Sequence, residues 1–454
     1  MTMTTFGSKT FICINAEKQS IDMKKILYSV FMLATMVLAA RSSDIIEPAV
    51  KRGMVLKANV EDTDTRATLT DNKGKYTFAF ATNDKVKVGN DQVEVYYTFT
   101  KNDTEFASAD ALQTTKDATW CAFFPSETID LTNQSGTLAD VAQKYALAGA
   151  TATPTTGSDG LNITMKAKTA VLCIVGVNKD DILDISVKDA DGKYVSSLTA
   201  DKKSADFKVE TSDTKVSLLK AKGAGVYYVV VPADVKISVY NGAKPLYSGD
   251  KIINTTNADG LMAGKYYTLL TGKTKGKEYA TINGVEVEKD WVQLWPGGPK
   301  FATENVAEKI NFTEARKTGD AYVWGANWRT PTQDELNKFF TVKEEKEEDK
   351  KEDTKYVICP INTTGRLIEK NGGYGLLLTG VNPGYTGNTL YLPAEPKSES
   401  YYIHSIYLTS EYNSNGSDAH VFSYFGDLEN VYHIGFSLQS TVTKCMVRPV
   451  LVEK

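Results

Sequence analysis

Short apolar runs separated by polar turns occupy the chain from residue 59 to about residue 272. Residues 93–99 alternate apolar and polar side chains, as in a strand with one buried face, whereas residues 169–175 form an apolar run typical of a strand buried on both faces. Residues 226–232 and 264–270 are two more runs rich in aromatic and β-branched side chains. Such repetition predicts antiparallel β-sandwiches, and the length allows two in tandem.

Turn and helix signals subdivide this region. The pair Asp191-Gly192 stands between two apolar runs, which predicts a hairpin whose turn uses the positive φ that glycine adopts freely. Residues 137–147 are the one short helix that we expect here. Thr-Pro and Gly-Ser pairs lie just before or within residues 157–161, where we place the joint. The two sandwiches are therefore predicted at residues 45–160 and 161–280.

From residue 286 the local composition changes, because glycines and tryptophans lie close together in the sequence. Residues 286–454 are therefore predicted to form a compact, loop-rich domain. Its clearest local signal follows Trp328. Thr330 is expected to cap a helix, Pro331 to occupy its first position and Gln333 to complete a capping box. The side chains of Leu336, Phe339 and Phe340 then fall on one face of that helix.

Residues 23–44 have the build of a secretory signal peptide. Met23 is followed by two lysines, by an apolar run at 26–40 that is too short for a comfortable bilayer span, and by small residues. The flanks of Arg41 resemble the cleavage site of a bacterial lipoprotein signal, in which that position is cysteine. We therefore expect the protein to be exported. We do not expect a lipid anchor, because Arg41 provides no thiol to which a lipid could be attached. Residues 1–44, an upstream extension plus the signal, are excluded from the fold, and no transmembrane segment is expected in the mature chain.

The composition is that of an ordinary globular protein. Lys and Arg number 52 against 56 Asp and Glu, and this balance does not favour nucleic acid as a partner. The five cysteines lack the close spacing of a metal or redox site. Cys121 and Cys173 fall in apolar runs and are expected to be buried thiols. Cys359 and Cys445 fall in one predicted domain, where their pairing after export stays open.

Five motifs occur in a distinctive order before residue 280. They are Thr-Arg-Ala at 65–67, Ala-Phe-Ala-Thr-Asn-Asp-Lys-Val at 79–86, Trp-Cys-Ala-Phe-Phe-Pro at 120–125, Tyr-Tyr-Val-Val-Val-Pro at 227–232 and Ala-Gly-Lys-Tyr-Tyr at 263–267. Together with the lipoprotein-type signal, their order and spacing resemble the fimbrillin family of Bacteroidales surface proteins. The resemblance covers about residues 45–275.

This resemblance implies two transthyretin-like β-sandwich subdomains, export as a lipoprotein to the outer membrane, and assembly into pili. In such pilins a protease cuts after an arginine near the start, the first strand leaves, and a strand from the next subunit fills the groove. The donated strand pairs the exposed main-chain groups and covers the core. Arg66 is the best match for the cut and Arg52 the second, while an uncut Arg66 in a surface loop stays the alternative.

A second set of motifs spans residues 286–454. It comprises Trp-Val-Gln-Leu at 291–294, Phe-Ala-Thr-Glu-Asn-Val at 301–306, Trp-Arg-Thr-Pro-Thr-Gln-Asp-Glu-Leu at 328–336, Thr-Leu-Tyr-Leu-Pro-Ala at 389–394 and Val-Arg-Pro-Val at 447–450. This set resembles the Fibrobacter-type major paralogous domain, a C-type-lectin-like module, and implies an α+β fold. The charged run 343–355 departs from the family pattern, and we expect it to be a solvated loop.

The sequence offers no catalytic constellation, so we do not expect an enzyme. His404, His420 and His433 occur singly, without the spacing of a metal site. Residues 411–418 begin like a calcium loop, but Phe422 stands where the closing carboxylate should be, which predicts a polar turn instead. We therefore expect neither a metal nor a cofactor.

Aromatic side chains near polar loops are the usual platform for a sugar. In the last domain the ligand-binding candidates are Trp324, Trp328, Tyr385, Tyr401, Tyr402 and Tyr412. The alternative for most of them is the core, because small lectin-like domains bury their tryptophans.

These features predict a cell-surface pilus subunit of accessory or tip type that carries a lectin-like adhesive head. Its expected partners are other pilin subunits, by strand donation, and a glycan of host or bacterial origin. Residues 446–452 are expected to close the last domain, which leaves no strand to donate and favours the tip position. The alternative is a monomeric secreted or surface glycan-binding protein that never enters a pilus.

Overall fold

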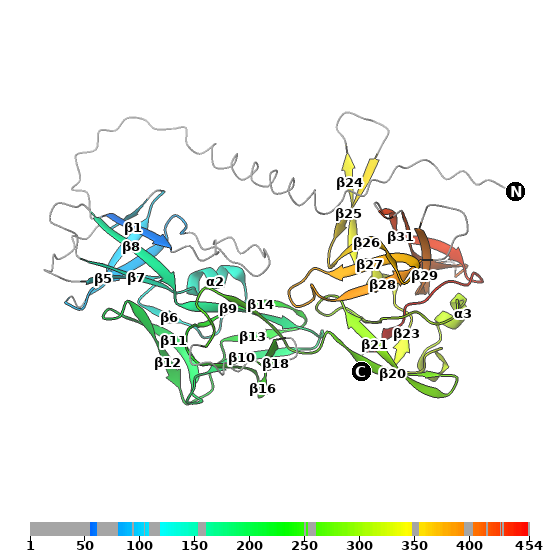
Figure 1. Ribbon diagram of the computed structural model, residues 1–454, viewed down its shortest axis with the longest axis horizontal. Helices are drawn as coiled ribbons and strands as arrows, with labels where there is room; N and C mark the ends of the chain where they lie inside the picture. Colours follow the sequence, from blue (N-terminus) through cyan, green and yellow to red (C-terminus); the bar gives the residue numbers. More distant parts are fainter. Residues whose placement is uncertain are drawn as a thin grey trace. The chain divides into compact units, whose positions relative to one another are not determined.

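The computed structural model describes residues 55–60, 80–92, 95–103, 105–108, 119–152, 160–248, 251–252, 260–346, 354–394, 403–414, 416–426, 428 and 431–452 (Figure 1). The chain divides into two compact units, one formed by Ile46–Gly272 and the other essentially by Lys273–Lys454. The predicted signal sequence and Arg41, Arg52 and Arg66 lie outside the described residues. Within the described part, no helix combines the length and apolar character needed to cross a membrane.

The first sheet of unit 46–272 closes into a barrel in the order β1-β4-β3-β2-β5-β7-β8. Its strands are β1 (Val55–Val60), β2 (Lys85–Gly89), β3 (Tyr97–Lys101), β4 (Phe106–Ala107), β5 (Thr119–Phe124), β7 (Leu147–Ala152) and β8 (Gly160–Ala167). An antiparallel β-sandwich was expected here. The sheet closes instead because β1 pairs with β4 on one side and with β8 on the other.

Two further sheets complete this unit. One contains β6 (Thr128–Asp130), β10 (Ile182–Lys188), β11 (Tyr194–Asp201), β12 (Asp206–Ser212), β13 (Leu219–Lys222), β15 (Ser238–Asn241) and β16 (Lys244–Pro245). The other contains β9 (Thr169–Gly176), β14 (Gly225–Pro232), β17 (Tyr247–Ser248), β18 (Lys251–Ile252) and β19 (Tyr266–Leu270). One apolar cluster runs through all three sheets, from Leu56 to Leu269. The chain leaves the barrel at Lys168, after β8, whereas the sequence placed the joint near 157–161.

Among the strands that the structure describes, most pairs are antiparallel, as expected, but two are parallel. β1 runs parallel to β8, and β19 runs parallel to β9. Local alternation of side chains does not reveal strand direction, and both pairs join segments that are far apart in the chain, as parallel pairing requires. The antiparallel prediction therefore failed at these two pairs.

Several local predictions for this unit are confirmed. Every residue of β9 is buried, as the apolar run at 169–175 indicated. β10 and β11 form the predicted hairpin, with Gly192 at φ +81° in its turn. The short helix is α2 (Leu138–Lys144), which Thr137 caps by accepting a hydrogen bond from the Asp140 amide. Cys121 and Cys173 are buried.

Asp181 ties the end of β9 to the segment after β19. Its carboxylate accepts hydrogen bonds from the amides of Val177 and Asn178 at 2.8 and 3.0 Å and from the Thr271 hydroxyl. Burial opposes ionisation of Asp181, but these hydrogen bonds outweigh it and lower the pKa of the carboxyl. A lowered folded-state pKa contributes stability above the unfolded pKa, and this contribution is lost as the pH falls through the folded value.

Asp181→Asn is therefore expected to lower the free energy of unfolding by about 1–2 kcal/mol at pH 7, and by less at pH 3. Urea unfolding at the two pH values measures the difference. Asp180→Asn is the matched control, since Asp180 is exposed and its carboxylate accepts no hydrogen bond from the described residues. An equal loss for Asp181→Asn at both pH values would contradict the assignment.

Unit 273–454 is built mainly from antiparallel sheets. The largest has the order β20-β21-β22-β32-β23 and contains β20 (Lys275–Ile282), β21 (Val285–Gln293), β22 (Lys300–Ala302), β23 (Trp328–Arg329) and β32 (Val450–Leu451). Three smaller sheets follow. The first pairs β24 (Phe340–Lys346) with β25 (Thr354–Pro360), and the second contains β26 (Thr363–Lys370), β27 (Gly373–Gly380) and β28 (Thr389–Pro393). The third contains β29 (Ile403–Tyr412), β30 (Asp418–Gly426) and β31 (Val431–Ser440). The helices are α3 (Phe312–Ala315), a 3₁₀ turn at Gly319–Ala321 and α4 (Gln333–Asn337).

The structure differs from the sequence predictions at three places in this unit. β20 pairs along its whole length with β21, so residues 275–280 belong to this unit and not to the preceding sandwich. Residues 343–346 and 354–355 of the charged run lie in the paired strands β24 and β25 instead of in a loop. The helix near Trp328 is capped two residues later than expected.

That cap is Thr332, whose hydroxyl accepts from the Glu335 amide, while the Glu335 carboxylate accepts from the Thr332 amide. Two capping boxes overlap in this sequence, and the one containing Glu335 is formed because Arg329 also pairs with that carboxylate. Thr330 is buried and donates its hydroxyl to the Ala315 carbonyl at 2.6 Å. Leu336 and Phe339 are buried. The predicted helix face is too long, because α4 ends at Asn337 and Phe340 is the first residue of β24.

Candidate functional site

The first described strand, β1, is held by main-chain pairing on both sides (Figure 1). All six of its residues are in register with residues 160–165 of β8, and Val55 and Leu56 pair with Ala107 and Phe106 of β4. The Leu56 side chain is completely buried in the core of the unit. Loss of β1 would leave β4 and β8 with unpaired main-chain groups and would uncover this core.

The place of β1 in the chain distinguishes the two candidate cleavage arginines. Arg66 follows β1 in the sequence and Arg52 precedes it, although both lie outside the described residues. A cut after Arg66 would separate β1 from the rest of the chain. A cut after Arg52 would leave β1 attached, so only Arg66 suits removal of this strand.

Three of the candidate sugar-binding aromatics lie in the core of unit 273–454. Trp324 is 3% exposed, and Trp328 and Tyr385 are completely buried. The two tryptophans pack edge to face with ring centroids 5.3 Å apart, and Trp328 donates from Nε1 to the Tyr279 carbonyl. These rings cannot offer a face to a surface ligand, so the structure favours the packing alternative for them. Tyr401 and Tyr402 lie outside the described residues.

Tyr412 is the candidate aromatic that is exposed, with 44% of its surface accessible. It lies at the end of β29, and its ring packs against Phe312 of α3 with centroids 5.6 Å apart. The Arg316 guanidinium lies 4.5 Å from the Tyr412 ring centroid and 5.5 Å from that of Phe312. An arginine thus stacks on the one described candidate ring that a ligand could reach.

A cavity of about 150 Å³ lies beside this arginine. Its lining comes from the end of α3, from the segment around β23, from the cap of α4 and from β29. The lining residues are cationic or carry hydroxyl groups, apart from Ala315: Ala315, Arg316, Lys317, Thr318, Arg329, Thr330, Thr332 and Ser410. Three cations and four hydroxyl groups around one opening suit an anionic or polyhydroxyl ligand.

Local structure fixes the shape of this cavity. Arg329 donates from Nη1 and Nη2 to the two carboxylate oxygens of Glu335, at 2.8 and 2.6 Å. The Ser410 amide donates to the Pro331 carbonyl at 2.9 Å, which joins β29 to the start of α4. Asn311 caps α3 by accepting from the Glu314 amide at 3.0 Å. The cavity wall is therefore held by local hydrogen bonds and by one hydrogen bond between segments far apart in the sequence, Ser410 to Pro331.

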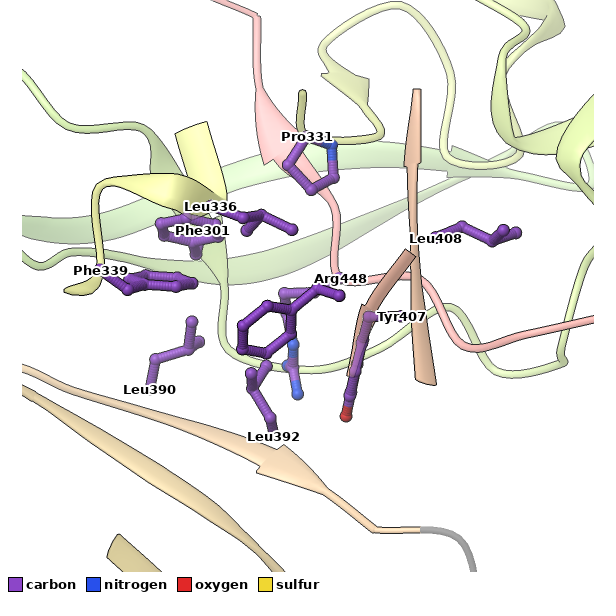
Figure 2. Close-up of a pocket in the computed structure, with 10 residues that line it drawn as sticks. Phe301, Pro331, Leu336, Phe339, Leu390, Leu392, Tyr407, Leu408 and Arg448 are labelled. Atoms are coloured by element: carbon purple, nitrogen blue, oxygen red, sulfur yellow. The ribbon is translucent and has the colours of Figure 1, made fainter. Parts of the chain in front are cut away.

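A second cavity in this unit is a packing feature. Figure 2 shows it lined by apolar side chains, including Phe301, Leu390 and Leu392, together with Arg448. Its volume is about 10 Å³, which is room for about one water molecule. Arg448 is buried and donates from Nη2 to the Tyr391 carbonyl and from Nη1 to the Ala302 carbonyl. Burial lowers the pKa of Arg448 and raises that of the neighbouring Tyr407 to about 12.

The remaining candidate chemistry does not assemble into a site. Among the described residues, no group of three His, Cys, Asp or Glu side chains could hold a metal ion. Asn413 accepts hydrogen bonds from the Ser417 and Asp418 amides between β29 and β30, which agrees with a polar turn, although residues 411, 412 and 418 of the predicted turn lie in the two strands. Cys445 is buried. The side chain of Cys359 is not among those that the structure describes, so whether the two cysteines pair stays open.

Comparison with known proteins finds no matching family model and no matching curated protein. A fimbrial protein from Bacteroides ovatus aligns over 88% of this chain and 99% of its own, with 10% identity and a TM-score of 0.26. A "putative cell adhesion protein" from Bacteroides uniformis aligns over 54% of this chain and 99% of its own, with 11% identity and a TM-score of 0.31. At TM-scores below 0.5, neither alignment serves as evidence for the fold or function of this chain.

Arg316 and Ser410 are not among the candidate residues predicted from the sequence. Neither belongs to a local motif, since Arg316 ends a four-residue helix and Ser410 lies within a strand. The stacking of Arg316 on Tyr412 depends on how α3 packs beside β29, which side-chain periodicity does not encode. A weak signal existed in the pair Arg316-Lys317, two adjacent cations after a short helix.

Proposed function

We propose that the chain is an exported subunit of a bacterial surface pilus, of accessory or tip type, whose first strand is removed and replaced by a strand from another subunit. The observation that carries this proposal is the position of β1. It precedes Arg66, closes the barrel between β4 and β8, and inserts Leu56 into the core. The signal-like residues 23–44 and the fimbrillin-like motifs add support from the sequence. Lipid anchoring is not part of the proposal, because Arg41 stands where a lipoprotein has cysteine.

Residues 446–452 are unsuitable as a donated strand. β32 lies between β22 and β23 in the main sheet of its unit, and Val447, Arg448 and Val450 are buried. Withdrawing this segment would open that sheet and uncover its core. The proposed accessory or tip role, in which the subunit accepts a strand without giving this one, agrees with that arrangement.

Unit 273–454 is proposed to be the adhesive head, which binds a glycan through the cavity beside Arg316. The cavity carries hydroxyl groups and cations that a sugar could contact. The same cavity supports the second candidate function, a monomeric glycan-binding protein outside a pilus. The two candidates differ in what becomes of β1.

Treatment with an arginine-specific protease separates them. For a pilus subunit we expect a cut after Arg66, release of β1, and new oligomers when a pilin that carries a donor strand is added. Intact-mass measurement and size-exclusion chromatography follow the three events. Arg66→Lys should block the cut and the oligomers, whereas the matched variant Arg52→Lys should block neither.

The monomeric binder predicts a different result. Its β1 would remain in place after protease treatment, and the elution volume would not change with added pilin. Release of β1 from the Arg66→Lys variant would also contradict the assignment of Arg66.

A further inference from the structure

The charges around the cavity beside Arg316 do not balance. Arg329 is paired with Glu335 through two hydrogen bonds, and Lys317 donates to Glu314 at 2.6 Å. Arg316 forms no ion pair with any described residue, and its guanidinium makes no hydrogen bond there. One positive charge at the cavity is therefore uncompensated.

The aromatic contacts hold the Arg316 guanidinium without using its hydrogen-bond donors. Phe312 and Tyr412 contact the group at ring-centroid distances of 5.5 and 4.5 Å. A guanidinium is a planar fork, so contacts with ring faces leave its N–H groups available in the plane. Two parallel N–H groups match the two oxygens of a carboxylate. Restraint by the rings also lowers the entropy cost of binding such a group.

Hydroxyl groups that line the same cavity complete the set of contacts. Ser410 contributes its amide to the Pro331 carbonyl, and its hydroxyl makes no hydrogen bond to any described residue. The Thr332 hydroxyl accepts from the Glu335 amide and keeps its own proton to donate. These two groups could bond to ring hydroxyls of a sugar whose acid group lies on Arg316.

We infer that this cavity binds the carboxylate and adjoining ring of an acidic sugar, with Arg316 as the residue that recognises the acid. The inference rests on the proposed adhesive function of unit 273–454. A volume of about 150 Å³ is below the roughly 300–1,000 Å³ of pockets for larger ligands, which suits one carboxylate and part of one ring. Uronic acids and sialic acids share this chemistry, and the experiment distinguishes them.

Isothermal titration of the purified full chain with glucuronic acid, N-acetylneuraminic acid, neutral methyl glucoside and inorganic sulfate tests the inference. We expect one of the two sugar acids to bind at least tenfold more tightly than methyl glucoside and than sulfate. Arg316→Gln should weaken that binding tenfold or more, and Arg316→Lys should weaken it less, because lysine keeps the charge but loses the fork. The matched control Arg366→Gln removes an exposed cation that does not line the cavity and should change the affinity less than twofold.

The inference would be overturned by no binding of either acid, by equal binding to the Arg316→Gln variant, or by sulfate binding as tightly as the sugar acids. The last result would mean a general anion site. Binding of a neutral glycan independently of Arg316 would keep the adhesive function and reject the acidic sugar. None of these results bears on removal of β1, which belongs to the other unit and has its own test.

Discussion

A chain cut after Arg66 is expected to bind an added peptide of residues 53–62 that restores β1. The peptide would pair again with six residues of β8 and two residues of β4, and its Leu56 side chain would again be buried in the core. Cleaving the intact chain in the presence of excess labelled peptide avoids an interval in which the barrel stays open. Fluorescence anisotropy of the label then reports binding.

A peptide that carries Leu56→Asp is the matched control. The substitution leaves main-chain pairing possible but places a carboxylate in an apolar core, which costs several kcal/mol. We expect its affinity to fall by at least 100-fold, equivalent to about 2.7 kcal/mol. Equal binding of the two peptides would contradict the claim that β1 is held by both pairing and burial.

Gly149→Ala is expected to destabilise unit 46–272 by about 3 kcal/mol. Gly149 is a buried residue of β7, and a Cβ there would lie 2.2 Å from the Thr164 carbonyl oxygen of β8. Main-chain atoms cannot move aside as a flexible side chain can, so β8 would have to shift. Thr164 is in register with Asn59 of β1, and the shift should also loosen β1.

Gly272→Ala in the same unit is the control. Its added Cβ meets side-chain atoms no closer than 3.7 Å, so we expect a change within about 0.5 kcal/mol. Urea unfolding of both variants, followed by tryptophan fluorescence and circular dichroism, measures the difference. A Gly149→Ala variant as stable as the control would show that β7 and β8 do not approach as closely as described.

Local elements were predictable from the sequence because their signals are local. The apolar run of β9, the Asp-Gly turn between β10 and β11 and the short helix α2 each involve few neighbouring residues. The cap of α4 was predicted at Thr330 because two capping boxes overlap there. The box that forms is the one whose Glu335 carboxylate also pairs with Arg329, a contact that exists only in the folded chain.

The pairing of strands that are far apart in the sequence was harder to predict. Side-chain alternation says which face of a strand is buried, not which strand lies beside it, so the parallel partners of β1 and β9 were missed. The candidate sugar-binding aromatics were chosen by residue type. The structure buries Trp324, Trp328 and Tyr385 and leaves Tyr412 accessible beside Arg316, a difference that depends on the packing of α3 against β29.

The central claim is that β1 is a temporary strand, present in the precursor and absent from the assembled subunit. The most direct measurement is the intact mass of the chain recovered from surface fibres of cells that express it. We predict a polypeptide that begins at Ala67, with β1 missing and unit 273–454 complete. A fibre-associated chain that begins before Val55 and so retains β1 would contradict the account.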